Sequence, residues 1–149
     1  MAYDMNYKMQ ENGKMGEWKK LCTELLGERF HNVELRIAVY EDSLVFNVYY
    51  GTTALGKFIF RVFLGNERIV ISTDTHVTRK YRRMGIATAL QEIKKRVATD
   101  LEFTTMLCTV SSENEPQKEL LNKLGWSYLC DVGNRKDETS YAQLYSKVV

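Results

Sequence analysis

The most informative part of the sequence is the stretch HVTRKYRRMGIATALQEIKKRV, residues 76–97. Its first half carries arginine or lysine at four of the five positions from 79 to 83, and Gly85 follows shortly after. Its second half repeats apolar residues every three or four positions, which predicts an amphipathic helix that begins just after Gly85. The apolar face of this helix consists of Ile86, Leu90, Ile93 and Val97, and a polar face consists of Gln91, Glu92, Lys95 and Arg96.

The basic cluster admits three interpretations: a grip on an anion, a nucleic-acid patch, or a solvated start to the helix. A helix start exposes unpaired amide groups that carry a partial positive charge. Gly85 and the small Ala87 would let a phosphate approach those amides closely. Arg82 and Arg83 can add charge-assisted hydrogen bonds to the same oxygens, so a diphosphate is the natural ligand.

The charge balance argues against a polyanionic partner. The chain has 21 basic and 19 acidic side chains, and its net charge of +2 creates no global field that would attract nucleic acid. A nucleic-acid module would have to combine residues 79–83 with residues 94–96, and Tyr81 is the one aromatic residue in the cluster. Any basic site is therefore expected to be local, and nucleic acid is not the expected partner.

Length and composition indicate a single soluble domain over residues 1–149. Hydrophobic residues make up 44% of the chain and charged residues 27%, as in ordinary globular proteins. No signal-peptide core or membrane-length apolar run is visible, so we expect a cytoplasmic protein with no membrane partner. Three cysteines fit reduced, packed thiols better than a disulfide framework or a metal site, and a catalytic Cys108 is the weaker alternative.

Further helices and strands are predicted on both sides of residues 76–97. We expect helices at residues 16–28 and 116–124, strands at residues 33–40, 44–50, 57–64, 68–75, 103–110, 126–132 and 141–148, and a loose arm or short strand over the first dozen residues. Short breaks between the first four strands favour an antiparallel meander, whereas the helix before residues 103–110 lets that strand run parallel to its predecessor. Residues 103–110 read as a strand buried on both sides, and Gly125 is well placed for a left-handed helix cap. The predicted fold class is α+β.

Two groups of residues resemble the motifs of the GCN5-related N-acetyltransferase (GNAT) family. Val77 followed by Arg82-x-x-Gly85-x-Ala87 is similar to the motif with which that family binds the diphosphate of acetyl-CoA. One helix and one strand later comes a segment similar to the family's N-x5-L-x2-K-x-G-aromatic pattern. It consists of Asn114, Leu120, Lys123, Leu124, Gly125 and Trp126. The resemblance covers the chain from about residue 57 to its carboxyl end.

The resemblance implies a GNAT-like fold, with a mixed and mostly antiparallel central sheet, flanking helices and a β-α-β unit that binds acetyl-CoA. In that unit the two strands splay apart, backbone groups near residues 75–77 pair with the pantetheine arm, and a backbone amide holds the developing oxyanion. Acetyl-CoA is the implied cosubstrate, and transfer would be direct, without an acyl-enzyme. The residues that the resemblance assigns to acetyl-CoA are Thr75, His76, Val77, Arg82, Arg83, Met84, Gly85, Ile86, Ala87, Thr88 and Asn114.

The groups that would move protons depart from the family pattern. An amine acceptor with a pKa of about 10.4 must lose a proton before it attacks. The positions at which relatives carry a Glu or His base hold Ile71 and Thr73 here. Asp74 and His76 lie beside them, on the opposite face from Thr73 unless a bulge re-aims them.

The family's usual acid, a tyrosine in the second motif, is replaced here by Leu121. A CoA thiol with a pKa of about 8.5 can leave without a strong acid. If an acid is needed, the candidate substitutes are Tyr128, Tyr141 and Tyr145. The catalytic candidates are Thr73, Asp74, His76 and Tyr128.

The resulting hypothesis is an N-acetyltransferase that moves an acetyl group from acetyl-CoA directly to a primary amine of a protein or small molecule. The alternative is a catalytically degenerate protein of the same fold that binds CoA, a protein partner or both. A homodimer is a reasonable expectation, because edge strands at the carboxyl end often pair in this fold. Aromatic residues available to line the acceptor pocket, although core packing comes first for each, are Trp18, Tyr40, Tyr49 and Tyr50.

Overall fold

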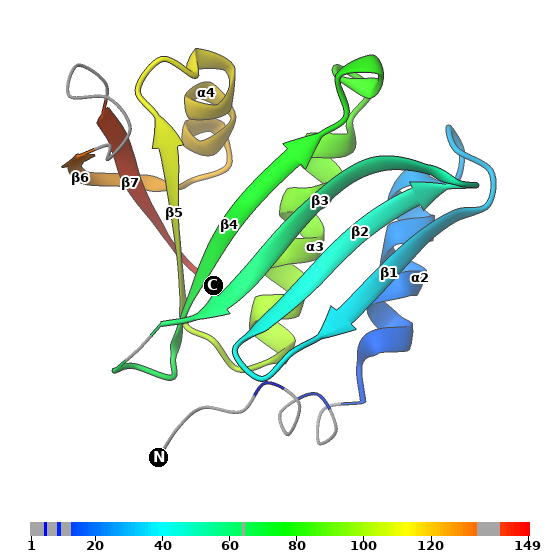
Figure 1. Ribbon diagram of the computed structural model, residues 1–149, viewed down its shortest axis with the longest axis horizontal. Coiled ribbons are helices and arrows are strands. Elements are labelled where there is room, and N and C mark those ends of the chain that lie inside the picture. Colours follow the sequence, from blue (N-terminus) through cyan, green and yellow to red (C-terminus); the bar gives the residue numbers. More distant parts are fainter. Residues whose placement is uncertain (1–4, 6–8, 10–12, 64, 134–140) are drawn as a thin grey trace.

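A seven-stranded sheet with helices packed against it forms the framework (Figure 1). The computed structural model describes residues 5, 9, 13–63, 65–133 and 141–149. The strands are β1 (Val33–Val39), β2 (Ser43–Tyr50), β3 (Thr53–Val62), β4 (Ile69–Val77), β5 (Thr105–Ser111), β6 (Ser127–Gly133) and β7 (Tyr141–Val148). The helices are α2 (Met15–Leu26), α3 (Ile86–Asp100) and α4 (Glu115–Lys123), together with the short 3-10 turn η1 (Arg79–Tyr81).

The sheet is mixed, with the order β1-β2-β3-β4-β5-β7-β6. Five of its six neighbouring pairs are antiparallel, and β4 with β5 is the parallel one. Parallel neighbours need a crossover, and α3 supplies it between the end of β4 and the start of β5. The predicted α+β class, the meander and the parallel pair are thus confirmed.

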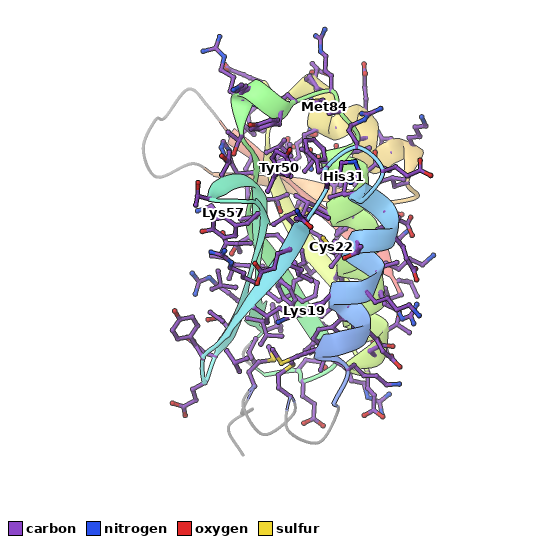
Figure 2. All side chains as sticks on the ribbon, turned by 90° about the vertical axis from the view of Figure 1, so that its right-hand side faces the viewer. Lys19, Cys22, His31, Tyr50, Lys57 and Met84 are labelled. Atoms are coloured by element: carbon purple, nitrogen blue, oxygen red, sulfur yellow. The ribbon has the colours of Figure 1, made fainter. Side chains whose placement is uncertain are left out.

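Helices α2 and α3 lie side by side over β1 to β4 (Figure 1). Figure 2, turned by 90°, shows α2 on one side of the strands, with Cys22 and Lys19 labelled on it. The core beneath α2 is aromatic: Phe46 of β2 stacks on Phe58 of β3 at 4.5 Å between ring centroids, and Trp18 of α2 lies 6.1 Å from Phe46. Burial of these large apolar rings is what fixes α2 to the sheet.

Two strand predictions were wrong, the first because turn chemistry was read where strand pairing continues. Residues 53–56 were placed in a turn, but β3 starts at Thr53, which pairs with Tyr50 of β2. The strand predicted at 103–110 as buried on both sides starts at Thr105 and alternates between buried and more exposed residues. Gly125 is confirmed at the end of α4, with a φ of +86°. The hydrogen bond from Trp126 N to Leu121 O closes that helix end.

The amino-terminal prediction is only partly tested. Most of the first dozen residues lie outside the described part of the chain, as does Leu64 of the third predicted strand. Met5 and Met9 are described: both have helical backbone and both are buried in the core. For these two residues neither a loose arm nor a strand is correct.

Truncating the aromatic core should unfold the protein far more readily than truncating an exposed ring. Phe46 is fully buried and contacts Phe58, Phe60 and Trp18, so Phe46→Ala should lower the free energy of unfolding by about 3–5 kcal/mol. Tyr40, which is 54% exposed, is the control, and Tyr40→Ala should stay within about 0.5 kcal/mol of the parent. Urea unfolding followed by circular dichroism measures both, and equal losses would contradict this description of the core.

Candidate functional site

The two parallel strands separate before either of them ends. Their pairing starts at Ile69 with Thr105 and stops at Ser72 with Cys108. Strand β4 continues to Val77 on its pairing with β3, and β5 continues to Ser111 on its pairing with β7. Over these last residues the backbone groups that face the other strand have no partner on it. Unpaired strand edges of this kind can bind an extended amide-containing chain.

A cavity of about 490 Å³ occupies the gap between the two strands. Its lining includes Cys108 and Val110, which are buried, and also Thr109 and Ser111, which are exposed. Alternating residues of β5 point to opposite faces of the sheet, so both faces contribute to the cavity. The remaining lining residues are Ser72, Thr73, Thr75, Gln91, Lys94, Asn114 and Gln117.

A second cavity, of about 540 Å³, lies where β4 passes into α3. It shares Thr75, Gln91, Asn114 and Gln117 with the first, so the two cavities adjoin. The structure brings together here every residue that the sequence assigned to acetyl-CoA except Met84. Those lining residues are Thr75, His76, Val77, Arg82, Arg83, Gly85, Ile86, Ala87, Thr88 and Asn114. Met84 instead lines a third cavity beside α2, where its carbonyl accepts a hydrogen bond of 2.6 Å from Arg29 Nη1.

The turn before α3 leaves room for a ligand to approach the backbone closely. Gly85 occupies the N-cap position with a φ of +84°, and no side chain caps the helix. The first-turn amides of α3 therefore have no side-chain acceptor at the N-cap, and their residues line the second cavity. Arg82 Nε donates to Val77 O at 3.2 Å, which ties the basic turn to the end of β4. An anion bound here would meet helix amides and two exposed arginines.

An irregularity in β4 changes the direction of its last side chains. Thr73 lies opposite Ile59 on β3, whereas His76 lies opposite Lys57. The register therefore advances three residues on β4 for two on β3, which is one extra residue in a β-bulge. Because Ile59 and Lys57 share a face, Thr73 and His76 also share one. The regular alternation that placed His76 opposite to Thr73 is corrected by this bulge.

The four catalytic candidates are not equally placed. Thr73 lines the first cavity with a buried, unpaired Oγ1, and His76 lines the second. The side chain of Asp74 lies outside the described part of the structure. Tyr128 lines neither cavity: its hydroxyl donates to Asp131 Oδ1 at 2.7 Å, and this hydrogen bond raises the Tyr128 pKa to about 12. The structure thus places Tyr128 on β6 and does not bring it together with Thr73 and His76.

The most unusual residue of the site was not identified from the sequence. Lys94 was named only within the basic residues 94–96 of the nucleic-acid interpretation, whereas in the structure it is 2% exposed and points into the first cavity from α3. Gln91, assigned to a polar face, is 6% exposed and lines both cavities. Ala87, Gln91, Lys94 and Ala98 recur at the spacing of one helix face. This second set of residues on one helix face could have predicted that Gln91 and Lys94 point toward the sheet.

Lys94 is a lysine in a desolvated environment. Its Nζ donates to Thr75 Oγ1 at 2.7 Å and lies 5.4 Å from the centroid of the Phe58 ring. Burial lowers the Lys94 pKa from 10.5 to about 8, and the nearby Cys108 opposes this shift weakly. Burial likewise raises the Cys108 pKa to about 11, so Cys108 is a thiol at neutral pH and a poor nucleophile.

Two kinds of feature are absent from the described residues. No helix among them is long and apolar enough to cross a membrane. No three histidine, cysteine, aspartate or glutamate side chains in the described part of the chain gather as metal ligands.

Comparison with known proteins gives a fold. No protein-family model matches the sequence, and no curated protein matches it significantly. Solved structures do match. One, from Desulfovibrio desulfuricans and provisionally assigned as a GNAT-family acetyltransferase, aligns with a TM-score of 0.65 at 10% identity over 72% of this chain and 69% of its own.

Two further structures carry more specific descriptions. A nourseothricin acetyltransferase aligns with a TM-score of 0.65 at 16% identity, over 78% of this chain and 84% of its own. A provisionally assigned streptothricin acetyltransferase from Bacillus anthracis, solved with acetyl coenzyme A, aligns with a TM-score of 0.64 at 11% identity, over 79% and 85%. The chain therefore has the mixed α+β fold of GNAT acetyltransferases.

Removing the buried charge of Lys94 should stabilise the protein at neutral pH. The lowered pKa means that the charged form costs the native state roughly 3 kcal/mol, at about 1.4 kcal/mol per pKa unit. Methionine has a similar length and no charge, so Lys94→Met should raise the free energy of unfolding at pH 7 by about 1–3 kcal/mol. Above pH 8 native Lys94 loses its proton, whereas the unfolded lysine keeps its own until about pH 10.5. The parent therefore gains stability across that window, and the difference should shrink.

Urea unfolding at several pH values between 7 and about 10 measures this difference. Lys95→Met, at the adjacent exposed position, is the control and should show no pH-dependent change. A variant that is less stable than the parent at pH 7, or a difference that does not vary with pH, would show that Lys94 is not buried as a cation.

Proposed function

We propose that this protein is an acetyl-CoA-dependent N-acetyltransferase that transfers an acetyl group directly to a primary amine of a protein or small molecule. The observation that carries the proposal is the gap between β4 and β5, which leads without interruption into the uncapped start of α3. An unpaired strand edge next to an anion-binding turn matches a ligand that joins an amide-containing arm to a diphosphate. A single domain over residues 1–149 would hold the whole site, and a cytoplasmic location would supply the cosubstrate.

The donor half of the site would be made largely by backbone. Backbone groups of residues 73–77 that face the gap would pair with the pantetheine amides, while the first-turn amides of α3 would hold the diphosphate. Arg82 and Arg83, both exposed beside the turn, would complement its charge. Acetyl-CoA would supply the activated acyl group. A β4 amide at the bulge would hold the charge that develops on the carbonyl oxygen.

The acceptor would reach the acyl group through the gap. Thr109 and Ser111 line the first cavity from the exposed face of β5, opposite the side on which Cys108 and Val110 are buried. An amine that enters from this face would meet Thr73, whose buried Oγ1 has no hydrogen-bond partner and could hold a water. The bulge brings His76 to the same face as Thr73, so His76 could accept the amine proton through such a water.

Ligand binding and group transfer test this proposal in sequence. Titration calorimetry should show a saturable heat with acetyl-CoA and with CoA, and both ligands should raise the melting temperature. Incubation with acetyl-CoA and a panel of amines and amine-bearing peptides should then add one acetyl mass to at least one acceptor. No binding at millimolar ligand would refute the proposal. Binding without transfer to any acceptor would favour the catalytically degenerate alternative.

Substitution of Gly85 should separate ligand binding from folding. Glutamate at this position would put a carboxylate where the diphosphate is proposed to lie, so Gly85→Glu should weaken acetyl-CoA binding at least 100-fold, or about 3 kcal/mol. Gly51 is the matched control, because it also has a positive φ, +63°, and open space around its Cβ direction. Gly51→Glu reproduces the backbone strain in the β2–β3 turn, away from both cavities. Equal affinity of the two variants for acetyl-CoA would mean that the diphosphate binds elsewhere.

A further inference from the structure

We propose that Lys94 is a catalytic residue of this site: its ammonium group stabilises the CoA thiolate as it leaves and then gives it a proton. The inference rests on the proposed acetyl-CoA site and adds to it the proton donor that the second motif lacks. At the position where that motif would carry a tyrosine, Leu121 is fully buried in the core. Tyr128 is bonded to Asp131 away from the cavities.

The position of Lys94 along α3 fits the reach of the pantetheine arm. Lys94 lies nine residues after Gly85, so it sits about 13 Å along the helix axis from the proposed diphosphate turn. The arm between diphosphate and sulfur has roughly twelve chain atoms, as many as about four residues of backbone, and spans about 13–14 Å when extended. A ligand anchored at the turn would therefore bring its sulfur to the level of Lys94.

The surroundings of Lys94 leave its charge available to a ligand. Phe58 of β3 presents its ring, Thr75 of β4 accepts one hydrogen bond, and Cys108 of β5 is a protonated thiol. Gln91, one turn earlier on α3, lines the same cavity. Among the side chains described around Lys94, a group that does not include Asp74, no carboxylate pairs with it.

Two hydroxyls near this end of the cavity also lack partners. Ser72 Oγ and Thr73 Oγ1 are buried without a hydrogen bond, and both residues line the same cavity as Lys94, Ser72 from the side of α3 and Thr73 from the opposite face of β4. Ser72 is 3% exposed and belongs to the last residue pair before the strands separate. Buried hydroxyls and an ammonium group with unused donors together suit an anion that forms inside the cavity. The leaving thiolate is such an anion.

The proton balance of the step is simple. The acceptor nitrogen forms a bond to the acyl carbon, the carbon–sulfur bond breaks, and its electron pair stays on sulfur. Lys94 gives one proton to that sulfur, the acceptor nitrogen loses one to water, and Lys94 is reprotonated from solvent. A Lys94 pKa of about 8 lies close to the value of about 8.5 for a free thiol, so the two groups are matched as acid and base. While the sulfur stays beside the ammonium group, their attraction favours the ion pair, and the proton passes to sulfur as CoA leaves the site.

The ionisation of bound CoA tests the role of Lys94 without an acceptor. Thiolate formation is followed by ultraviolet absorbance as the CoA complex is titrated with base, and the acetyl-CoA complex, which has no free thiol, is the blank. Cys130 is an exposed thiol, so the titration is done in a Cys130→Ser background to remove its signal. Cys22 and Cys108, whose pKa values burial raises to about 11, stay silent in the working range.

An ammonium group beside the sulfur should lower the pKa of the bound CoA thiol by one to three units from its free value of about 8.5. Lys94→Met should abolish this shift, whereas Lys95→Met, on the exposed side of α3, should keep it. The proposal is overturned if CoA bound to the parent protein titrates at or above the free value, or if Lys94→Met titrates like the parent.

Calorimetric binding separates failure of this inference from failure of the site itself. If CoA does not bind the parent protein at all, the proposed function fails, and with it this role of Lys94. If CoA binds and its thiol titrates as in free solution, the site stands and Lys94 is structural. If Lys94→Met does not fold, the titration of the parent complex still tests the role of Lys94, because a bound thiol with the pKa of free CoA overturns the proposal by itself.

Discussion

The adjoining cavities of this protein lie where two parallel strands separate and where the helix that connects them begins. Strands β4 and β5 pair only from Ile69 to Ser72 and from Thr105 to Cys108, and each then follows its antiparallel neighbour. A parallel pair in a sheet is normally buried and continuous, so an early end leaves backbone groups without partners. The crossover helix α3 begins at the open end of this gap and runs back along it. One break in pairing therefore creates both a binding edge and a helix start that faces the same space.

The gap also explains why a charged side chain can lie inside the domain. Lys94 would be costly in a continuous core, where an unpaired ammonium is among the least tolerated groups. Here Lys94 borders a cavity whose lining includes threonine, serine and glutamine side chains. Burial lowers its pKa to about 8, so the side chain can still carry a charge near neutral pH. A buried charged lysine lowers the stability of the folded protein, whereas an apolar residue at the same position would not. Such trade-offs between stability and function are common at binding and catalytic sites.

Much of the fold could be predicted from the sequence, because the informative patterns were local. The periodicity of residues 86–97, the turns between the early strands and Gly125 at a helix end each follow from short-range geometry. The proposed diphosphate turn was located by the spacing of Arg82, Gly85 and Ala87, and the structure does gather these residues around one cavity.

The errors came from features that depend on tertiary structure. The bulge that turns His76 to the face of Thr73 is visible only in the β3–β4 register, since no residue type in that segment predicts a bulge. Lys94 was not recognised as a site residue, because lysine is rarely buried and residues 94–96 look like one basic run. Tyr128 was selected for its chemistry, while its hydrogen bond to Asp131 depends on the local course of β6. In each case sequence identified the residue type, and packing decided its role.

Amide hydrogen exchange, recorded with and without saturating acetyl-CoA, reports on the unpaired backbone itself. If acetyl-CoA pairs with this strand edge, exchange slows at residues 73–77 and at the first turn of α3, whereas residues of β1 and β2 do not change. Binding that leaves the amides of residues 73–77 unaffected, or that protects a different edge of the sheet, would contradict this pairing.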